Sequence, residues 1–484
     1  MTARIFCYNP AVKKFPPGPS LAKYVFTYFA EHFDYLRLVK RLIREYGDII
    51  YVRAGNRHHY FINRPDYIEK VLTAGYKIRT SRPGPLRHAL GLGLITSQGD
   101  LHRTMRHTLQ PFFQKQAALD KTPVIMEETE RILGPWKDGE VRDIAREMTH
   151  LTLGIILRIL FGTNFEGELE KMGEAGYLIH LYMHQDPASH WNMLIEEIEE
   201  KFPFLGSTKA GRARRYIDDK IYGLIRARRE AGNLEGADLL SSLLRIREQN
   251  PNLKELTDRQ IRDEMVTMYI AGHETTSNAL AWTCFLLSGH REVEEKLHGE
   301  LDSVLSGRLP TAEDIPNLRY TRMVLAESMR LYPPVWTLGR RPVEDFELGD
   351  YVIPEKSTLL ISPYFVHHDE RFYPDPERFD PERFSPEEEA KRPKFTYFPF
   401  GGGNRKCIGE GLAWVEAILM LSTICQRWRL RLVKGHPIAL EPLISLKPKY
   451  GMRMALEERQ PVPIPAQDPA ARFIEPFINP QLSL

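Results

Sequence analysis

A glycine-rich turn with one cysteine stands directly before the most apolar stretch of this 484-residue chain. The turn reads Phe-Gly-Gly-Gly-Asn-Arg-Lys-Cys-Ile-Gly over residues 400–409, and the apolar stretch follows over residues 411–425. A membrane-spanning helix needs about 20 apolar residues, and Glu416 interrupts this shorter run, so the stretch predicts a buried helix. Glycines permit positive φ and leave space for a bulky planar group beside the backbone. The chain must therefore fold with one sulfur at the start of a buried helix.

The chemistry expected of Cys407 is that of a metal-binding thiolate. Free N–H groups and the dipole at a helix start, together with Arg405 and Lys406, favour a thiolate over a thiol. Zinc sites usually need three or four protein ligands at short spacings, and no second cysteine or histidine lies nearby in the sequence. A single anionic sulfur is better suited to an axial haem ligand. The alternative is a buried, inert cysteine, which is the usual state of an isolated one.

The composition excludes several classes of protein. Four cysteines (Cys7, Cys284, Cys407 and Cys425) are too few for a disulfide-rich secreted scaffold. A formal net charge of +2 gives no general attraction to nucleic acid, so no nucleic-acid partner is expected. A hydrophobic fraction of 42% and a charged fraction of 27% rule out wholesale disorder. The composition is that of an ordinary folded protein.

No apolar run is long enough for a signal peptide or an integral membrane span, so the chain is expected to be soluble and cytoplasmic. Residues 24–44 carry apolar side chains at helical spacing beside Lys40, Arg41 and Arg44. This pattern fits an amphipathic helix packed on the domain, and it leaves peripheral association with a membrane surface open.

The hydrophobic pattern predicts a mainly α (α+β) fold with strand-like runs near the two ends. Its clearest helix runs from Thr257 to about Ser288, since Thr257 and Gln260 have the spacing of a capping box. Residues 164–208 are less regular and are expected to form a lid-type region. No repeat or linker divides the chain. We therefore expect a Pro-rich N-terminal segment over residues 1–20, one domain over residues 21–458, and a Pro-rich tail over residues 459–484.

Residues 271–276, Ala-Gly-His-Glu-Thr-Thr, interrupt the pattern of this long helix. Glycine and adjacent threonines lower helix propensity, so something other than helix stability selected them. Small residues would open room beside the helix, and a threonine hydroxyl can bond the carbonyl one turn back. On the residues alone, a packing notch with a back-bonded threonine is the favoured interpretation.

Over about residues 16–455 the chain resembles the cytochrome P-450 family, in the form of a soluble bacterial-type member without a membrane anchor. The cysteine turn is similar to the family's haem-binding loop, and Glu327-Ser-Met-Arg330 looks like its E-x-x-R helix. The resemblance implies that Glu327, Arg330 and Arg383 form a buried charge network that holds the haem loop in place. Two similar strings leave alternatives: Glu128 to Arg131 also reads E-x-x-R, and Arg378 lies in a copy of the segment around Arg383.

The resemblance also assigns roles around a haem b cofactor, with Cys407 as the axial ligand of its iron. Thr275 would hydrogen-bond dioxygen and Glu274 would help to deliver protons, whereas His273 is expected behind the site or facing solvent. The haem propionates would need cationic or donor partners; Arg341 is the neighbour that could be confused with one of them. The implied cofactor contacts are Cys407, His102, Arg106, Arg340, Arg405, Phe400, Gly401, Gly409 and Ala271.

The residues expected to line the substrate pocket are mostly apolar, which favours a hydrophobic small molecule such as a terpene, fatty acid, steroid or polyketide. Core packing explains the same residues equally well. They are Leu92, Leu94, Met268, Ala271, Val335, Trp336, Leu338 and Tyr450.

The implied activity is that of a haem-thiolate monooxygenase, which inserts one oxygen atom from O2 into a C–H or C=C bond. No phosphate-cradling glycine fingerprint or flavin-binding segment follows Cys407, so electrons are expected from an external ferredoxin or flavodoxin with an NAD(P)H reductase. Two alternatives remain: a haem-thiolate isomerase, dehydratase or peroxygenase that needs no electron donor, and a non-catalytic haem protein that carries or senses a ligand. The Glu274–Thr275 pair argues against the first. A monomer is expected.

Overall fold

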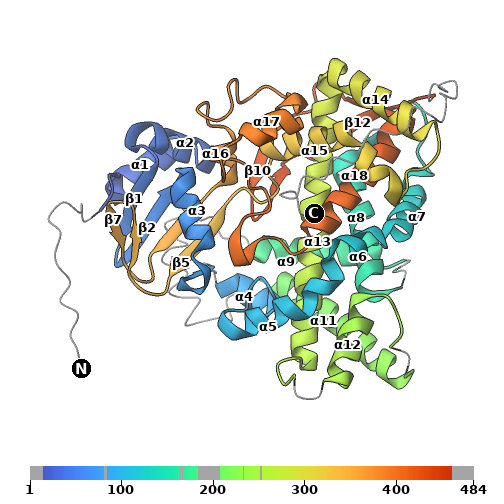
Figure 1. Ribbon diagram of the computed structural model, residues 1–484, viewed down its shortest axis with the longest axis horizontal. Helices are drawn as coiled ribbons and strands as arrows, with labels where there is room; N and C mark the ends of the chain where they lie inside the picture. Colours follow the sequence, from blue (N-terminus) through green and yellow to red (C-terminus); the bar gives the residue numbers. More distant parts are fainter. Residues whose placement is uncertain are drawn as a thin grey trace.

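Helices dominate the structure, a computed structural model that describes residues 15–80, 84–163, 165, 167–183, 208–232, 234–250 and 253–460. Figure 1 shows them gathered in one large body, with a smaller portion rich in β-strands beside it. The helices are α1 (Leu21–Ala30), α2 (Tyr35–Tyr46), α3 (Pro65–Thr73), α4 (Gly84–Leu90), α5 (Gly99–Leu109), α6 (Lys115–Leu119), α7 (Thr122–Leu133), α8 (Ile144–Phe161), α9 (Leu169–Met183), α11 (Thr208–Glu230), α12 (Leu239–Gln249), α13 (Asp258–Gly289), α14 (Arg291–Leu305), α15 (Arg319–Leu331), α16 (Pro363–His367), α17 (Pro386–Lys391) and α18 (Glu410–Arg427).

The strands form one five-stranded sheet of order β1-β2-β8-β5-β3, one three-stranded sheet of order β4-β12-β9, and the hairpins β6–β7 and β10–β11. Only β2 and β8 pair in parallel among the described strands. The strands are β1 (Ile49–Ala54), β2 (Arg57–Ile62), β3 (Ile78–Thr80), β4 (Val141–Asp143), β5 (Leu338–Pro342), β6 (Phe346–Leu348), β7 (Tyr351–Ile353), β8 (Thr358–Ile361), β9 (Trp428–Leu432), β10 (Leu440–Pro442), β11 (Leu446–Pro448) and β12 (Arg453–Glu458). The expected mainly α fold with a smaller β portion is confirmed.

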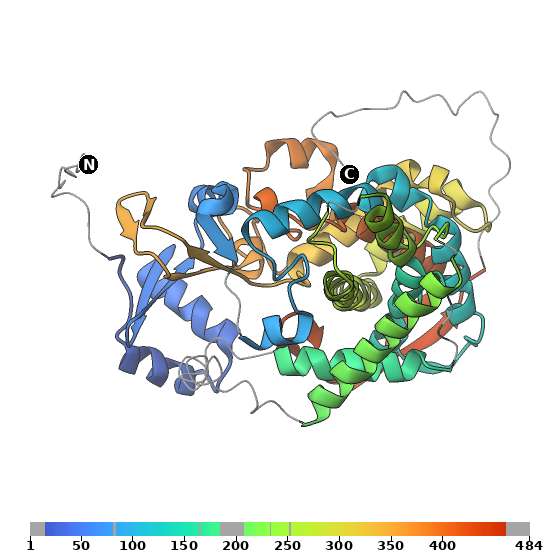
Figure 2. The same ribbon diagram turned by 90° about the horizontal axis from the view of Figure 1, so that it is seen from below.

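Helix α13 forms the centre of the helical body. The side chain of Thr257 accepts a hydrogen bond from the backbone N–H of Gln260, so the predicted cap is present. The helix is seen nearly end-on in Figure 2, with other helices around it. A Cβ added at Gly272 would lie 2.7 Å from the side chain of Ile156 in α8. Gly272 is therefore a packing notch that α8 fills, which confirms the interpretation favoured from the residues alone.

The amphipathic helix expected over residues 24–44 is two helices in the structure, α1 and α2. Asp34 caps α2 by accepting a hydrogen bond from the backbone N–H of Arg37. His32 and Phe33 both have positive φ, which ends the preceding turn. A capping aspartate and a left-handed turn can interrupt a helix without any break in its apolar spacing, which is why periodicity missed this boundary.

Part of the region expected to be irregular, residues 164–208, is the regular helix α9; residues 184–207 lie outside the described residues. The same is true of residues 1–14 and 461–484, so the predicted N-terminal and C-terminal segments stay predictions. In the described ranges, every helix is too short or too polar to cross a membrane.

Candidate active site

The loop that carries Cys407 is held in shape by backbone hydrogen bonds and by a close approach to α3. The backbone N–H of Cys407 donates to the carbonyl of Phe400 over 2.9 Å, immediately before α18 begins. Gly403 has a φ of +65°, and a Cβ on it would lie 2.0 Å from the carbonyl oxygen of Leu72. Only glycine fits there, because a side chain would be strained and would strike the α3 backbone. The loop therefore presents Cys407 in a fixed position at the start of a buried helix.

The Cys407 thiol is accessible, in contrast to Cys284 and Cys425, which are buried. Desolvation by the surrounding protein raises the pKa of the Cys407 thiol, while the N–H of Gly409 and the cations Arg106 and Lys406 oppose this rise. The net shift of the Cys407 pKa is therefore upward, opposite to the sequence expectation. The cations that favour the thiolate are Arg106 and Lys406, whereas the sequence had suggested Arg405 and Lys406. A thiol loses its proton when it binds a metal, so a metal at Cys407 would supply the charge that turns the thiol into a thiolate.

Three guanidinium groups from separate elements lie partly or fully buried without a carboxylate partner in the described ranges. Arg106 on α5 donates to the carbonyl of Lys406 and to the side chain of Gln110. Arg405 donates to the carbonyls of Leu94 and Ser97, and Arg340 on β5 is buried with the carbonyl of Gly339 as its partner. Burial lowers the pKa of Arg340 and Arg405 to about 10, and it lowers that of Arg106.

These arginines fit an anionic cofactor. A buried cation without a counter-charge is costly, and an acidic ligand with two carboxylates would supply the missing charge. Arg106 lies close enough to Cys407 to influence its pKa, and Arg405 lowers the pKa of Arg340, so the cations and the sulfur belong to one region. The two propionates of a haem match this charge, while its iron matches the thiol. His102, buried one turn before Arg106 on α5, lies on the same helix face.

The β5 strand separates Arg340 from its neighbour Arg341. Successive side chains of a strand point to opposite faces, and here Arg340 is 6% exposed whereas Arg341 is half-buried. Arg341 influences the pKa of His59 in β2, and Arg340 is instead influenced by Arg405 of the cysteine loop. Arg340 is thus the one directed toward the candidate cofactor region.

The centre of α13 becomes accessible at Ala271 and Thr275, although the ten residues before Ala271 are buried. The Thr275 hydroxyl donates to the Ala271 carbonyl over 2.9 Å, one helical turn earlier. Its oxygen keeps lone pairs that can accept a further hydrogen bond. His273 points the other way: it is 4% exposed and its Nδ1 lies 2.7 Å from the carbonyl oxygen of Tyr269. The option that His273 faces solvent is therefore wrong.

Glu274 is half-buried and both of its carboxylate oxygens have partners. Oε2 lies 2.6 Å from Nδ1 of His180 on α9, and Oε1 accepts a hydrogen bond of 2.8 Å from the Ser445 hydroxyl. Burial raises the pKa of the Glu274 carboxyl. The hydrogen bond and charge of His180, with smaller contributions from His273 and Ser445, outweigh this effect, so the net pKa is below its usual value. Glu274 is therefore ionised at neutral pH and held between two other elements.

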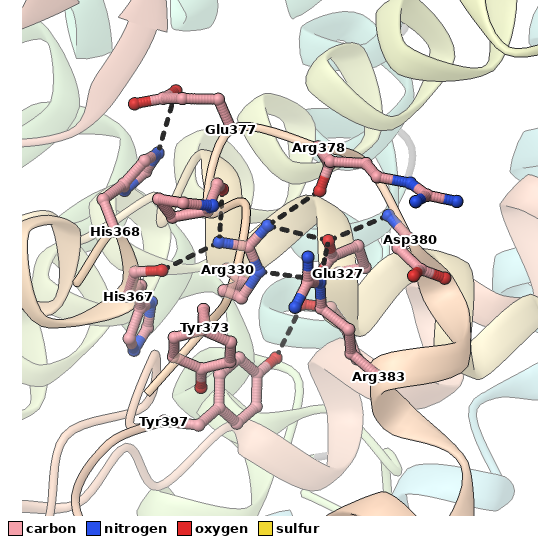
Figure 3. Close-up of polar contacts among 12 residues, drawn as sticks. Glu327, Arg330, His367, His368, Tyr373, Glu377, Arg378, Asp380, Arg383 and Tyr397 are labelled. Carbon is pink, nitrogen blue, oxygen red and sulfur yellow. Dashed lines mark hydrogen bonds and ion pairs between the residues drawn. The ribbon is translucent and has the colours of Figure 1, made fainter. Parts of the chain in front are cut away.

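Glu327 and Arg330 on α15 are both fully buried and form a two-point ion pair (Figure 3). Arg330 donates from Nε and Nη2 to the two oxygens of Glu327 over 2.6 and 2.7 Å. Glu327 also accepts from the backbone N–H of Asp380, and Arg383 Nε lies 3.6 Å from it. Arg378 contributes its carbonyl oxygen to Arg330 instead of its side chain. The structure thus brings together the three residues that the resemblance put in one network.

The network reaches the cysteine loop through His367. Arg330 donates from Nη1 to the carbonyls of His367 and Pro376, each over 2.8 Å. His367 Nε2 in turn accepts from the backbone N–H of Phe398, whose carbonyl accepts from Gly401. Each of these bonds is buried or partly buried. A displacement of Arg330 would therefore disturb the start of the loop that carries the cysteine.

The expected pocket residues differ in their surroundings. Leu92 and Leu94 lie in a loop tied to α13, since their N–H groups donate to Asp263 and Glu264 over 2.8 Å each. Burial raises the pKa of Glu264 to about 8. Of the other expected pocket residues, Met268 is buried, Ala271, Val335 and Leu338 are half-buried, Trp336 is 1% exposed and packs on Tyr35, and Tyr450 is 51% exposed.

Trp336 and Tyr450 have the least suitable positions for a pocket wall. The Trp336 indole N–H donates to the carbonyl of Leu443 and its ring belongs to the core beneath α1 and α2. Lys449 lies over the Tyr450 ring at the surface. His180, Ser445 and His367, by contrast, were missed: no motif surrounds them in the sequence, and only their burial beside a motif residue reveals them.

Comparison with known proteins agrees with this geometry. A family model described as "Cytochrome P450" matches residues 16–453. The chain is similar to cyclooctat-9-en-7-ol 5-monooxygenase of Streptomyces melanosporofaciens, with 36% identity over 81% of this chain and 84% of the relative. It is also similar to pentalenene oxygenase of Streptomyces avermitilis, with 29% identity over 86% of this chain and 91% of the relative. Among solved structures, the retinoic acid bound cyanobacterial CYP120A1 superimposes with a TM-score of 0.78 at 25% identity, covering 92% of this chain and all of the other.

Proposed function

Since this chain belongs to the cytochrome P450 family and is a haem-dependent monooxygenase, we propose that it oxidises a terpene hydrocarbon or terpenol. The names of two relatives, which cover most of the chain, point to this class: cyclooctat-9-en-7-ol 5-monooxygenase and pentalenene oxygenase. The apolar side chains expected around α13 suit such a molecule. Electrons would come from a separate ferredoxin or flavodoxin, and the enzyme would act as a cytoplasmic monomer.

The observation that carries the proposed activity is the accessible thiol of Cys407 in one region with Arg106, Arg340 and Arg405, together with an accessible turn of α13 that carries Thr275. These arginines are partly or fully buried and have no carboxylate partner within the described ranges. When bound, the haem supplies the activation of O2 that the thiolate ligand promotes. Arg106, Arg340, Arg405 and His102 would hold its propionates. The protein's other contributions are to exclude water, to orient the substrate and to bring protons to the reacting oxygen.

Proton supply falls to Thr275 and Glu274, which are neighbours on α13. The Thr275 hydroxyl lies on the accessible side of the helix, and because it donates its proton to the Ala271 carbonyl, its oxygen can accept a further hydrogen bond there. Glu274 carries the negative charge that can take a proton from solvent and pass it on, because it is only half-buried. The pair favours a monooxygenase over an isomerase, because the reduction of O2 consumes protons and an isomerisation consumes none.

The substrate class is tested by spectral titration of the haem-loaded enzyme with cyclic terpenes, terpenols, fatty acids, steroids and polyketides. We expect cyclic terpenes or terpenols to shift the Soret band at lower concentration than the other classes. Product should then form with NADPH and a surrogate ferredoxin system. A preference for fatty acids or steroids contradicts the terpene proposal, product formed with peroxide alone favours a peroxygenase, and binding without any product favours a ligand carrier.

Replacing Thr275 by alanine tests the role of its hydroxyl. We expect the ratio of product to released peroxide to fall about tenfold or more, which corresponds to about 1.4 kcal/mol in the partitioning of protons. Thr275→Ser is the matched control, because it keeps both the hydroxyl and the bond to the Ala271 carbonyl. The measurement is the stoichiometry of O2, peroxide and product. Unaltered coupling in the alanine variant would mean that the hydroxyl is not used.

A further inference from the structure

His180 connects the carboxylate of Glu274 to a helix outside the motif. The imidazole projects from α9, is 2% exposed, and places Nδ1 2.6 Å from Oε2 of Glu274 on α13. On the other side, Ser445 in the turn between β10 and β11 donates to Oε1 over 2.8 Å, and Asn278 Nδ2 donates to the Ser445 hydroxyl over 3.1 Å. One carboxylate therefore joins three elements that are distant in the sequence.

The direction of the contact follows from the chemistry of the two groups. An ionised carboxylate can only accept, so Nδ1 of His180 carries the proton and donates. The other nitrogen, Nε2, is buried and has no hydrogen-bond partner in the described part of the chain. Burying an imidazole with one nitrogen unsatisfied is unfavourable. Among the described residues, the bond to Glu274 is thus the polar contact that accounts for a histidine at this position.

Glu274 would lose its orientation without this bond. A glutamate side chain has several rotatable bonds, and fixing them costs conformational entropy that only firm contacts offset. Ser445 alone holds one oxygen and leaves the other partly buried without a partner, which favours protonation of the carboxyl. The titratable groups that face the pair within the described ranges are His273 and Tyr269, both on α13. Neither donates a hydrogen bond to the carboxylate, so neither can replace His180.

We propose that His180 is a positioning residue for proton delivery: its hydrogen bond fixes the Glu274 carboxylate beside Thr275 and thereby sets how efficiently O2 is converted to product. This inference rests on the proposed monooxygenase function. It adds a residue of α9 to a step that the motif on α13 was expected to perform alone. The efficiency of proton delivery then depends on how α9 packs against α13.

The test compares three haem-loaded variants, His180→Leu, His180→Asn and His298→Leu. Leucine fills similar volume without a hydrogen bond, whereas the asparagine amide can still donate from near the position of Nδ1. His298 on α14 is the matched control, because it is also a buried histidine and both of its ring nitrogens lack a partner in the described residues. We expect His180→Leu to lower the ratio of product to peroxide about tenfold, and the other two variants to stay within about twofold of the parent enzyme.

A second measurement does not depend on activity. Infrared difference spectra, each variant minus the parent enzyme at neutral pH, should show an additional protonated-carboxyl band in His180→Leu. This band should shift in deuterated water and should be missing when Glu274→Gln is combined with His180→Leu. If no variant or parent forms product, the proposed function fails while the band still tests the contact. The proposal is overturned if His180→Leu lacks the band or if His298→Leu shows it. It is also overturned if coupling in His180→Leu is unchanged or improved. If His180→Leu does not fold, His180→Asn carries the test. A parent-like spectrum and parent-like coupling in His180→Asn support the proposal, whereas a loss of coupling with a new band shows that a hydrogen bond at this position is not enough to hold Glu274.

Discussion

Replacing Arg330 by alanine is expected to destabilise the protein by about 3–5 kcal/mol, the usual effect of stranding one member of a buried ion pair. The change would leave Glu327 fully buried without its two-point partner, and it would also remove donors from the carbonyls of His367, Pro376 and Arg378. A typical domain is stable by about 5–15 kcal/mol, so this loss is a large share of the total. Little haem-loaded protein should be recovered.

The chain offers a matched control for this prediction. Glu128 and Arg131 have the same E-x-x-R spacing on α7, but the Arg131 side chain is 44% exposed and Glu128 has a second partner in Arg158. Because the buried Glu128 keeps Arg158 as a partner, Arg131→Ala should cost only about 1 kcal/mol. Urea unfolding and the haem-to-protein ratio measure both variants. A stable, fully loaded Arg330→Ala protein would contradict the view that the network holds the cysteine loop.

Local spacing made the Glu327–Arg330 pair and the cysteine turn predictable from the sequence. Glu327 and Arg330 are three residues apart, which puts both side chains on one face of α15. The glycines before Cys407 and the apolar run after it similarly describe one short stretch of chain, and Thr257 with Gln260 predicted the start of α13. In each case the physical constraint lies within about one helical turn of the residue concerned.

Contacts between distant elements could not be predicted in this way. The spacing of residues 271–276 suggests a gap at Gly272, but whether α8 fills it depends on how two helices cross. The same holds for His180, which looks like any polar residue of α9 until the fold brings it to Glu274. Trp336 follows two prolines and has the right chemistry for a pocket, yet the fold buries it under Tyr35.

The sign of the pKa shift at Cys407 shows a further limit. Sequence reasoning counted the helix start and nearby cations, all of which favour a thiolate. The fold adds desolvation, which acts against every charged form and here raises the pKa of the thiol. How deeply a loop is surrounded depends on the elements packed around it, and these come from α3, α5 and β5 as well as from the cysteine segment.

Replacing Cys407 by alanine is expected to abolish the red-shifted Soret band of the reduced carbon-monoxide complex. That band reports electron density donated by a thiolate to the iron, and Cys407 is the one accessible cysteine among those described. Because the side chain is exposed, the change should alter the free energy of unfolding of the haem-free protein by less than about 0.5 kcal/mol. The loss would therefore be chemical, in contrast to that of Arg330→Ala.

Two further variants keep this prediction decisive. Cys407→His retains a ligand for the iron, so it tests the band even if the alanine variant fails to keep haem; it should bind carbon monoxide with the band at shorter wavelength. Cys425→Ala is the control, since that thiol is buried on α18 and should leave the band in place. A red-shifted band that remains in both Cys407 variants would contradict the assignment of Cys407 as the iron ligand. If only the Cys407 variants lose the band, the loop between Phe400 and Gly409 positions the sulfur that binds the iron. The contacts that hold this loop, from Gly403 against α3 to the Arg330 network, then act on the position of that sulfur.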